Sequence, residues 1–291
     1  MNKTKKIKYI QFSLTVSESK WLIAYAVSQM KSVRHAMKNG KVIFKGGTTV
    51  SCAAEILVGT PLRICGRISQ RGAVSSKVRE GAAHSLLYSQ GQITNIDEDY
   101  DDRIMEMGPE DVIITGANII DIHGNAAMLA GSPAGNRCGK GVSAMTVEGA
   151  KVIVAAGIEK LIPGSVYDSV KCAQRKGIDS SRGMACGLFP VVGELVTELE
   201  AIQEISNVNA VLIGKGGIAG GEGSCLFQAW GTEPEIKRLE DILDQCYGKD
   251  ISGTAESLTE CSFPCAGCRE HLSCSYKQAE QGISPFIQNQ C

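Results

Sequence analysis

The stretch that most constrains the fold of this chain is KVIFKGGTTVSCAAE, residues 41–55. It predicts a short buried strand, a sharp turn at two glycines and a helix that begins with hydroxyl side chains. The first N–H groups of a helix have no partner within it, and the helix dipole favours a nearby negative charge. We therefore expect an anion to bind here, and a tight turn capped by a hydroxyl, without a ligand, is the alternative. The residues expected to face the anion are Gly46, Gly47, Thr48, Thr49 and Ser51.

Buried-strand patterns recur at 111–118 and 151–155, with helix and turn patterns between them. Such an alternation predicts an α/β protein with a Rossmann-like, mostly parallel sheet and helices on both faces. We expect this domain, with an N-terminal helix, over residues 1–190, then a small α+β subdomain over 191–250 and a Cys-rich tail over 251–291. Among the single elements, helices are expected over 17–39, 75–89 and 194–205, and a strand over 61–68.

Composition limits the partners of the chain. Its 291 residues carry a formal net charge of −1, which argues against a protein that binds nucleic acid through bulk charge. No apolar run reaches the roughly 20 residues that a membrane span needs, and the basic N-terminus lacks the pattern of a signal peptide. We expect a cytoplasmic protein, monomeric or homo-oligomeric, that takes a small anionic ligand or substrate and has no nucleic-acid or membrane partner.

A second expected strand ends in a comparable turn. Residues 111–118, DVIITGAN, are followed by the turn signature DIHGN. In a doubly wound sheet the turns after neighbouring strands lie at their carboxyl ends, where ligands bind. The second set of candidate ligand-binding residues is therefore Gly116, Ala117, Asn118, Asp121 and Asn125.

These two motifs together carry a resemblance to a known superfamily. KGGTTVS after a strand, followed by DVIITGANIIDIHGNAAMLAG, resembles glucosamine-6-phosphate deaminase, ribose-5-phosphate isomerase and the CoA transferases over residues 41–163. The resemblance implies a cleft that holds a sugar phosphate, an acyl-CoA or a folate-type substrate, and a transferase or an isomerase/lyase. The Ser-Glu-Asn-Gly context of the CoA-transferase nucleophile is absent, and so is the isomerase pattern of clustered Asp and Lys, so the resemblance assigns no reaction.

Three further features are candidates for a role in the site. The glycine-rich stretch 131–141 carries Arg137 and Lys140, which suit a phosphate or carboxylate unless the stretch is a plain surface turn. Glu222, between glycines in 214–223, is a candidate nucleophile or general base, although a flexible hairpin connection is favoured. Cys52 is a conceivable nucleophile because a helix N-terminus lowers a thiol pKa, although packing as a small core residue is favoured.

The tail contains the densest group of soft ligands. Its spacing, C-x3-C-x2-C-x5-C, places four thiols within one short stretch that has no core-like periodicity. An iron–sulfur cluster (4Fe–4S) is favoured over zinc, and free or disulfide-forming cysteines are the remaining alternative. The expected metal ligands are Cys261, Cys265, Cys268 and Cys274.

Two functions follow from these features. The first is a metabolic enzyme that acts on a phosphorylated, CoA-linked or other anionic small molecule in the Rossmann-like cleft, with the cysteines as a metal site. The alternative is a non-catalytic iron–sulfur or zinc protein, a redox sensor or electron-transfer protein that meets a redox partner and uses the cleft as a ligand or docking surface. The sequence alone does not identify the substrate, the reaction or the metal.

Overall fold

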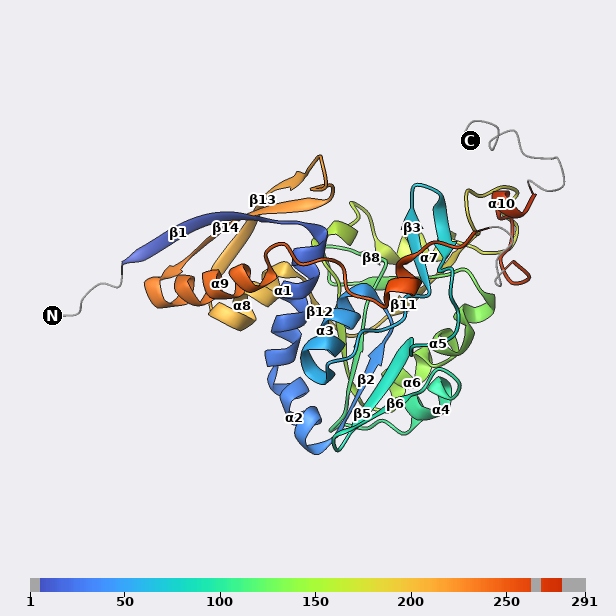
Figure 1. Ribbon diagram of the computed structural model, residues 1–291, viewed down its shortest axis with the longest axis horizontal. Coiled ribbons are helices and arrows are strands. Elements are labelled where there is room, and N and C mark those ends of the chain that lie inside the picture. Colours follow the sequence, from blue (N-terminus) through green and yellow to red (C-terminus); the bar gives the residue numbers. More distant parts are fainter. Residues whose placement is uncertain (1–5, 263–267, 279–291) are drawn as a thin grey trace.

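The computed structural model describes residues 6–262 and 268–278 of the chain (Figure 1). Its centre is a six-stranded sheet in the order β12-β10-β7-β2-β5-β6. The first four strands run parallel to one another, and the last two continue the sheet in antiparallel pairs. The strands are β2 (Lys41–Lys45), β5 (Ser85–Ser89), β6 (Gln92–Asn95), β7 (Val112–Thr115), β10 (Lys151–Ala155) and β12 (Glu194–Val196).

Helices cover both faces of this sheet. Because side chains alternate across a strand, Val42 and Phe44 of β2 pack on one face and Ile43 on the other. The first face is covered by α1 (Val16–Gln29), α2 (Lys31–Asn39) and α3 (Thr48–Val58). The second is covered by α4 (Tyr100–Met105) and α6 (Val142–Val147). The expectation of a mixed α/β chain built on a mostly parallel sheet is confirmed.

A smaller antiparallel sheet lies beside the first, at the left of Figure 1. It contains β1 (Ile7–Leu14), β14 (Ser224–Thr232) and β13 (Asn209–Gly216), and α8 (Glu198–Ser206) and α9 (Glu233–Cys246) pack on it. Its membership does not follow the boundary expected at residue 190. The N-terminal β1 pairs with β14 along its whole length, whereas β12 belongs to the six-stranded sheet.

The other elements are short. The hairpin β3 (Gly66–Ser69) and β4 (Gly72–Ser75) stands apart, and β8 (Ile119–Ile120), β9 (Ala126–Ala130) and β11 (Gly187–Val191) form a third small sheet. The remaining helices are η1 (Pro133–Gly135), α5 (Asn136–Lys140), η2 (Ile158–Lys160), α7 (Val166–Cys172), η3 (Ala255–Leu258) and α10 (Ser275–Gln278).

Several expected elements are wrong or divided. The helix expected over 75–89 is a loop followed by β5, because Leu86 and Leu87 pair with β2 and tertiary pairing overrides the local pattern. The helix expected over 17–39 is split at Met30, whose ψ of 134° is extended. The helix expected over 194–205 begins with a strand, and α8 starts only after the cap at Thr197. Of the strand expected over 61–68, only the last residues belong to β3.

The described part of the tail runs back along the large domain (Figure 1). Ser257 accepts a hydrogen bond from the N–H of Ile64, and the N–H of Cys261 donates to the carbonyl of Ser75. The N–H of Ala185 donates to the carbonyl of Leu272. The tail is therefore bound to the β3–β4 hairpin and to the loop before β11. Within the described ranges, no helix is long and apolar enough to cross a bilayer.

Candidate functional site

The parallel strands β2, β7 and β10 end along one edge of the sheet. They are followed by Gly46-Gly47, by Gly116-Ala117-Asn118 and by Ala156-Gly157. Neighbouring strands lie about 4.8 Å apart, so the ends of β2 and β10, with β7 between them, are separated by about 10 Å. We call the residues that follow these strands, 46–49, 116–118 and 156–159, the strand-end site.

The turn after β2 has the glycines, the hydroxyl side chains and the helix start that are expected of an anion-binding turn. The N-cap residue of α3 is Gly47, which has no side chain to cap the first N–H groups of the helix. Thr49 is only 2 % exposed, and its hydroxyl has no hydrogen-bond partner among the described residues. The ring of His84 lies over Gly46, where a Cβ would come within 2.1 Å of it. Because the His84 Nδ1 donates to the carbonyl of Arg63 at 2.8 Å, the ring is held in place and only glycine fits beneath it.

Ser51 and Cys52 have structural roles instead. The Ser51 hydroxyl accepts a hydrogen bond from the N–H of Leu62 at 2.8 Å and contacts the hydroxyl of Ser252 at 2.5 Å, so it fixes the tail to α3. Cys52 is fully buried and packs against Ala24. Burial raises the pKa of the Cys52 thiol to about 12, the opposite of the lowering expected from the helix dipole. The structure therefore favours core packing over nucleophilic chemistry for Cys52.

In the segment after β7, which runs through β8 to Asn125, the protein itself satisfies the predicted ligand groups. The Asp121 carboxylate accepts from the backbone N–H groups of His123, Asn125 and Val166 and from the Asn125 side chain, at 2.9–3.1 Å. Burial alone would raise the pKa of Asp121, but these hydrogen bonds lower it to about 2. The Asn118 side chain accepts from the N–H of Leu129 at 2.9 Å. These polar groups shape the turn, and a ligand role for them remains a prediction.

Sequence reasoning missed a group of charges after β10. A Cβ on Gly157 would lie 2.0 Å from a carboxylate oxygen of Glu159 and 2.9 Å from one of Glu198, so both carboxylates occupy the space in front of this glycine. Glu198 is 1 % exposed and accepts from the N–H of Ile158 at 2.8 Å. Both carboxylate oxygens of Glu159 are buried without a hydrogen-bond partner among the described residues, and the ammonium of Lys160 lies 3.8 Å from one of them.

The charges of this group act on Lys20 of α1. It is 7 % exposed, and the described part of the chain offers it no hydrogen bond or ion pair. Burial and the positive charge of Lys160 lower the pKa of Lys20, while the nearby charges of Glu159 and Glu198 oppose that shift. Burial and the charge of Glu159 raise the pKa of Glu198. The available sequence signals were a lysine in the otherwise apolar segment KWLIAYA and a Gly-Ile-Glu-Lys run directly after a buried strand.

Three other candidates lie elsewhere. Arg137, on α5, pairs with Asp101 at 3.1 Å, and Lys140 is exposed on the same short helix, which packs against α4. Glu222 accepts from the N–H of Gly220 at 3.0 Å in the hairpin between β13 and β14. It lines an open groove of about 400 Å³ beside the start of α1, and the described lining of that groove does not include the turn after β2.

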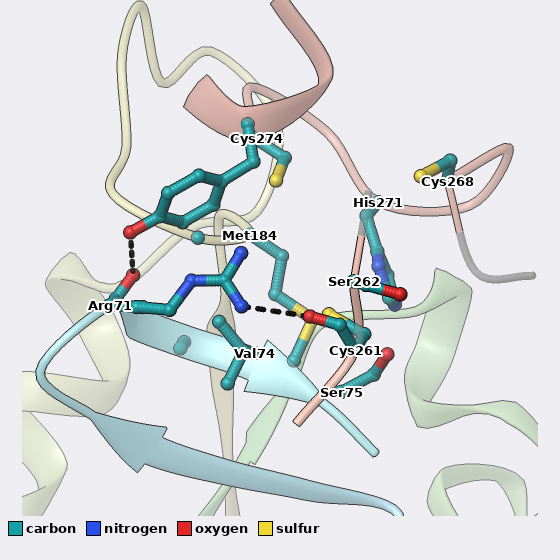
Figure 2. A pocket seen from close by; sticks show the side chains of 12 residues that line it. Arg71, Val74, Ser75, Met184, Cys261, Ser262, Cys268, His271 and Cys274 are labelled. Atoms are coloured by element: carbon teal, nitrogen blue, oxygen red, sulfur yellow. Dashed lines mark hydrogen bonds between the residues drawn. The ribbon is translucent and has the colours of Figure 1, made fainter. Parts of the chain in front are cut away.

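Three of the four predicted metal ligands meet at one pocket. Cys261, Cys268 and Cys274 line it together with His271, between β4 and the tail (Figure 2). Arg71 closes one side, where it donates to the carbonyl of Cys261 at 2.8 Å and lies 4.2 Å over the ring of Tyr276.

The fourth predicted ligand, Cys265, lies outside the described residues. Within the described ranges, no three Cys, His, Asp or Glu side chains are grouped closely enough to hold a metal. Thiolates and an imidazole are donors that suit zinc or iron, so the residue types fit such a metal. The four-cysteine metal site stays a prediction.

Comparisons with known proteins add no family. No protein-family model, curated protein or solved structure matches this chain. What the strand-end site and the cysteine pocket can do has to be inferred from their own chemistry.

Proposed function

We propose that this chain is a cytoplasmic enzyme that binds a small anionic molecule at the strand-end site. The proposal includes a Rossmann-like domain of the superfamily of glucosamine-6-phosphate deaminase, ribose-5-phosphate isomerase and the CoA transferases, with a transferase or isomerase/lyase activity. It also includes a metal held by the cysteines of the tail. The observation that carries it is the Thr49 hydroxyl, buried without a partner at the uncapped start of α3.

An anion would satisfy every group that this turn leaves open. A buried hydroxyl without a partner costs about 1–3 kcal/mol, and most buried polar groups in proteins are paired. Phosphate or carboxylate oxygens would accept from Thr49 and from the first N–H groups of α3, while the helix dipole adds a favourable field. Gly47, where a Cβ would meet only a side-chain carbon of Val50 at 3.9 Å, lets such a group approach the backbone closely. Phosphorylated and CoA-linked molecules carry anions of this kind.

The test compares Thr49→Val with Ser51→Ala. Valine keeps the shape of threonine and removes only the hydroxyl. We expect a sugar phosphate, CoA or a nucleotide to raise the Tm of the wild-type protein. Thr49→Val should bind the same probe roughly 10- to 150-fold more weakly, the equivalent of one hydrogen bond to a charged group. Ser51→Ala removes a hydroxyl that already has protein partners, so it should lower the Tm and leave the ligand-induced shift intact.

Two results would count against the proposal. If none of the three probe classes raises the Tm of the wild-type protein, the anion site loses its support. If Thr49→Val and the wild-type protein show the same shift, the anion binds elsewhere.

A second candidate function is supported by the shared position of Cys261, Cys268 and Cys274. In that case the chain is a non-catalytic iron–sulfur or zinc protein, a redox sensor or electron-transfer protein, and the strand-end site is a docking or ligand surface. Protein purified without oxygen should then be brown, with absorbance near ~400 nm, if the metal is an iron–sulfur cluster. Colourless protein with stoichiometric zinc would identify the other metal.

The metal measurement has a matched control within the chain. Cys274→Ser removes a predicted ligand that lines the pocket, whereas Cys186→Ser changes a cysteine that is absent from its described lining. We expect the first variant to lose bound metal and the second to retain it. Equal metal content in the two variants, or none in the wild-type protein, would argue against the predicted ligand set.

A further inference from the structure

The outer face of the small antiparallel sheet carries no charged side chain. Side chains alternate across its strands, so Phe12 and Phe227 pack inward with α8 and α9, and the next residue along each strand points outward (Figure 1). The outward residues, which we call the uncharged face, are Ile7, Tyr9, Gln11, Ser13, Asn209, Val211, Leu226, Gln228, Trp230 and Thr232. Charged residues make up 21 % of the chain and are normally found on exposed surface, so their absence from a whole sheet face indicates that a partner covers it.

The uncharged face is open and largely apolar. Tyr9 is 67 % exposed, Ile7 46 % and Val211 40 %. The rings of Tyr9 and Trp230 stack with their centroids 6.4 Å apart, so two aromatic side chains support each other on the face. Aromatic residues are enriched, and charged residues are depleted, at the centre of protein–protein interfaces. The composition of the face is therefore that of an interface with another protein surface.

The polar pair on this face suits a second copy of the same chain. The Gln11 amide donates to the Gln228 side-chain oxygen at 3.0 Å, a bond that uses neither N–H of Gln228 nor the oxygen of Gln11. In a two-fold interface the same patch meets itself, so each copy offers the donors and acceptors that the other copy needs. A face without charge gives a charged partner nothing to pair with, whereas a second copy is matched to it in both polarity and charge.

Net charge and size are also compatible with self-association. The formal net charge of the chain is only −1, so two copies repel each other little. Three strands of about eight residues form a face of about 26 Å by about 14 Å, or roughly 360 Å². The side chains add relief to this flat area, so two copies together bury more than twice as much. The interface lies at the small end of specific ones, and we expect a dissociation constant in the micromolar range.

We propose that the uncharged face is a homodimer interface, in which the sheets of two copies pack face to face across a two-fold axis near β14. Packed sheets lie about 10 Å apart with their side chains interdigitated, so Gln228 of one copy lies beside Gln228 of the other. The middle position of β14 distinguishes this dimer from one that extends the sheet through its edge strand β1, because β14 would then make no contact with the second copy. The inference does not depend on the anion site or the metal site.

The experiment measures the mass of the full-length chain in solution by sedimentation equilibrium, from about 1 to about 200 µM, on both sides of the expected dissociation constant. The wild-type protein should approach twice the 30.9 kDa of one chain as its concentration rises. A reducing agent is present throughout, because the exposed thiols of Cys65 and Cys172 can cross-link two copies. Gln228→Lys and Gln228→Glu each bring like charges together and should weaken the dimer at least about tenfold.

A mixture and a control make the test specific. Equal amounts of Gln228→Lys and Gln228→Glu should associate more tightly than either variant alone, since opposite charges then meet across the axis. Restored association also shows that both variants are folded. Val147→Lys is the matched control, because Val147 is an apolar residue of α6 that is 75 % exposed away from the small sheet, and it should dimerise as the wild-type protein does.

Four results would overturn the proposal. The first is a wild-type protein that keeps the mass of one chain over the whole range, and its binding to phospholipid vesicles would then identify a membrane as the occupant of the face. The second is a dimer that both Gln228 variants retain. The third is a loss of association in Val147→Lys equal to theirs. The fourth is a mixture that stays monomeric although circular dichroism shows both variants folded. If they are unfolded, Val211→Lys, which lies opposite Gln228 on β13, takes their place and should also weaken the dimer.

Discussion

The segment after β7, which runs through β8 to Asn125, and the turns after β2 and β10 follow neighbouring parallel strands of one sheet but differ in how their polar groups are satisfied. The Asp121 carboxylate accepts four hydrogen bonds from the protein. In contrast, the Thr49 hydroxyl and the Glu159 carboxylate have none within the described ranges. All three side chains are buried or nearly so. The contrast therefore reflects how the turns are built and does not follow from exposure.

This difference distinguishes polar groups that stabilise the fold from polar groups that can bind a ligand. A satisfied buried group contributes to stability and has little left to offer a ligand. An unsatisfied one lowers stability and gains most when a ligand supplies the missing partner. By this criterion Asp121 and Asn118 shape the fold, whereas the Thr49 hydroxyl keeps its capacity to bind a ligand. The sequence made Asp121 and Asn118 look as suitable for a ligand as Thr49.

The largest effect on stability is expected at Asp121. Asp121→Asn removes the charge that four donors face and places an amide N–H against some of them. We expect the free energy of unfolding to fall by about 2–3 kcal/mol near pH 7, since hydrogen bonds to a charged acceptor are strong. Urea unfolding of the variant and the wild-type protein measures this free energy. A variant as stable as the wild-type protein would show that the two kinds of turn do not differ.

The pH dependence of the free energy of unfolding provides a second test of the Asp121 hydrogen bonds. The pKa of Asp121 is about 2 in the folded protein, below the usual 3.8. A lowered carboxyl pKa gives stability that is present above the unfolded value and is lost as the pH falls through the folded value. The difference between the wild-type protein and Asp121→Asn should therefore narrow between pH 3.8 and about 2. A difference that stays constant over this window would contradict the assigned hydrogen bonds.

A smaller effect, with opposite signs for two hydroxyls on one helix, is expected within α3. Without ligand, Thr49→Val should raise the free energy of unfolding by about 1 kcal/mol, because it removes an unpaired buried hydroxyl. Ser51→Ala should lower it by about 1 kcal/mol or more, because the N–H of Leu62 then loses its acceptor. Thermal and urea unfolding of the two variants measure both signs. A loss of stability in Thr49→Val would mean that its hydroxyl has a partner.

Much of the central sheet was predictable because its signals are local. The apolar runs at 42–45, 112–115 and 151–155 are β2, β7 and β10, and the glycines after the first two strands mark turns. The edge of the sheet was less predictable. Leu86 and Leu87 fit a helix pattern as well as a strand, and only pairing with β2 decides between them. The strand β1 pairs with β14, which is more than 200 residues away in the chain. The local sequence pattern of a strand does not indicate which distant strand it pairs with.

The sequence by itself determined a mixed α/β chain whose parallel strands are followed by turns rich in glycine and hydroxyl side chains. These features were predictable because the patterns of strands, glycine turns and helices lie in consecutive residues. Only the tertiary structure decided which polar groups those turns leave unsatisfied. Whether Asp121 accepts from the N–H of Val166, or the Thr49 hydroxyl finds no partner among the described residues, depends on segments brought together by folding. Lys20 and Glu159 are about 140 residues apart in the chain, and because α1 packs against β10 the charge of Glu159 acts on Lys20. Hydrogen-bond satisfaction is a property of the assembled fold, and single residue types do not reveal it.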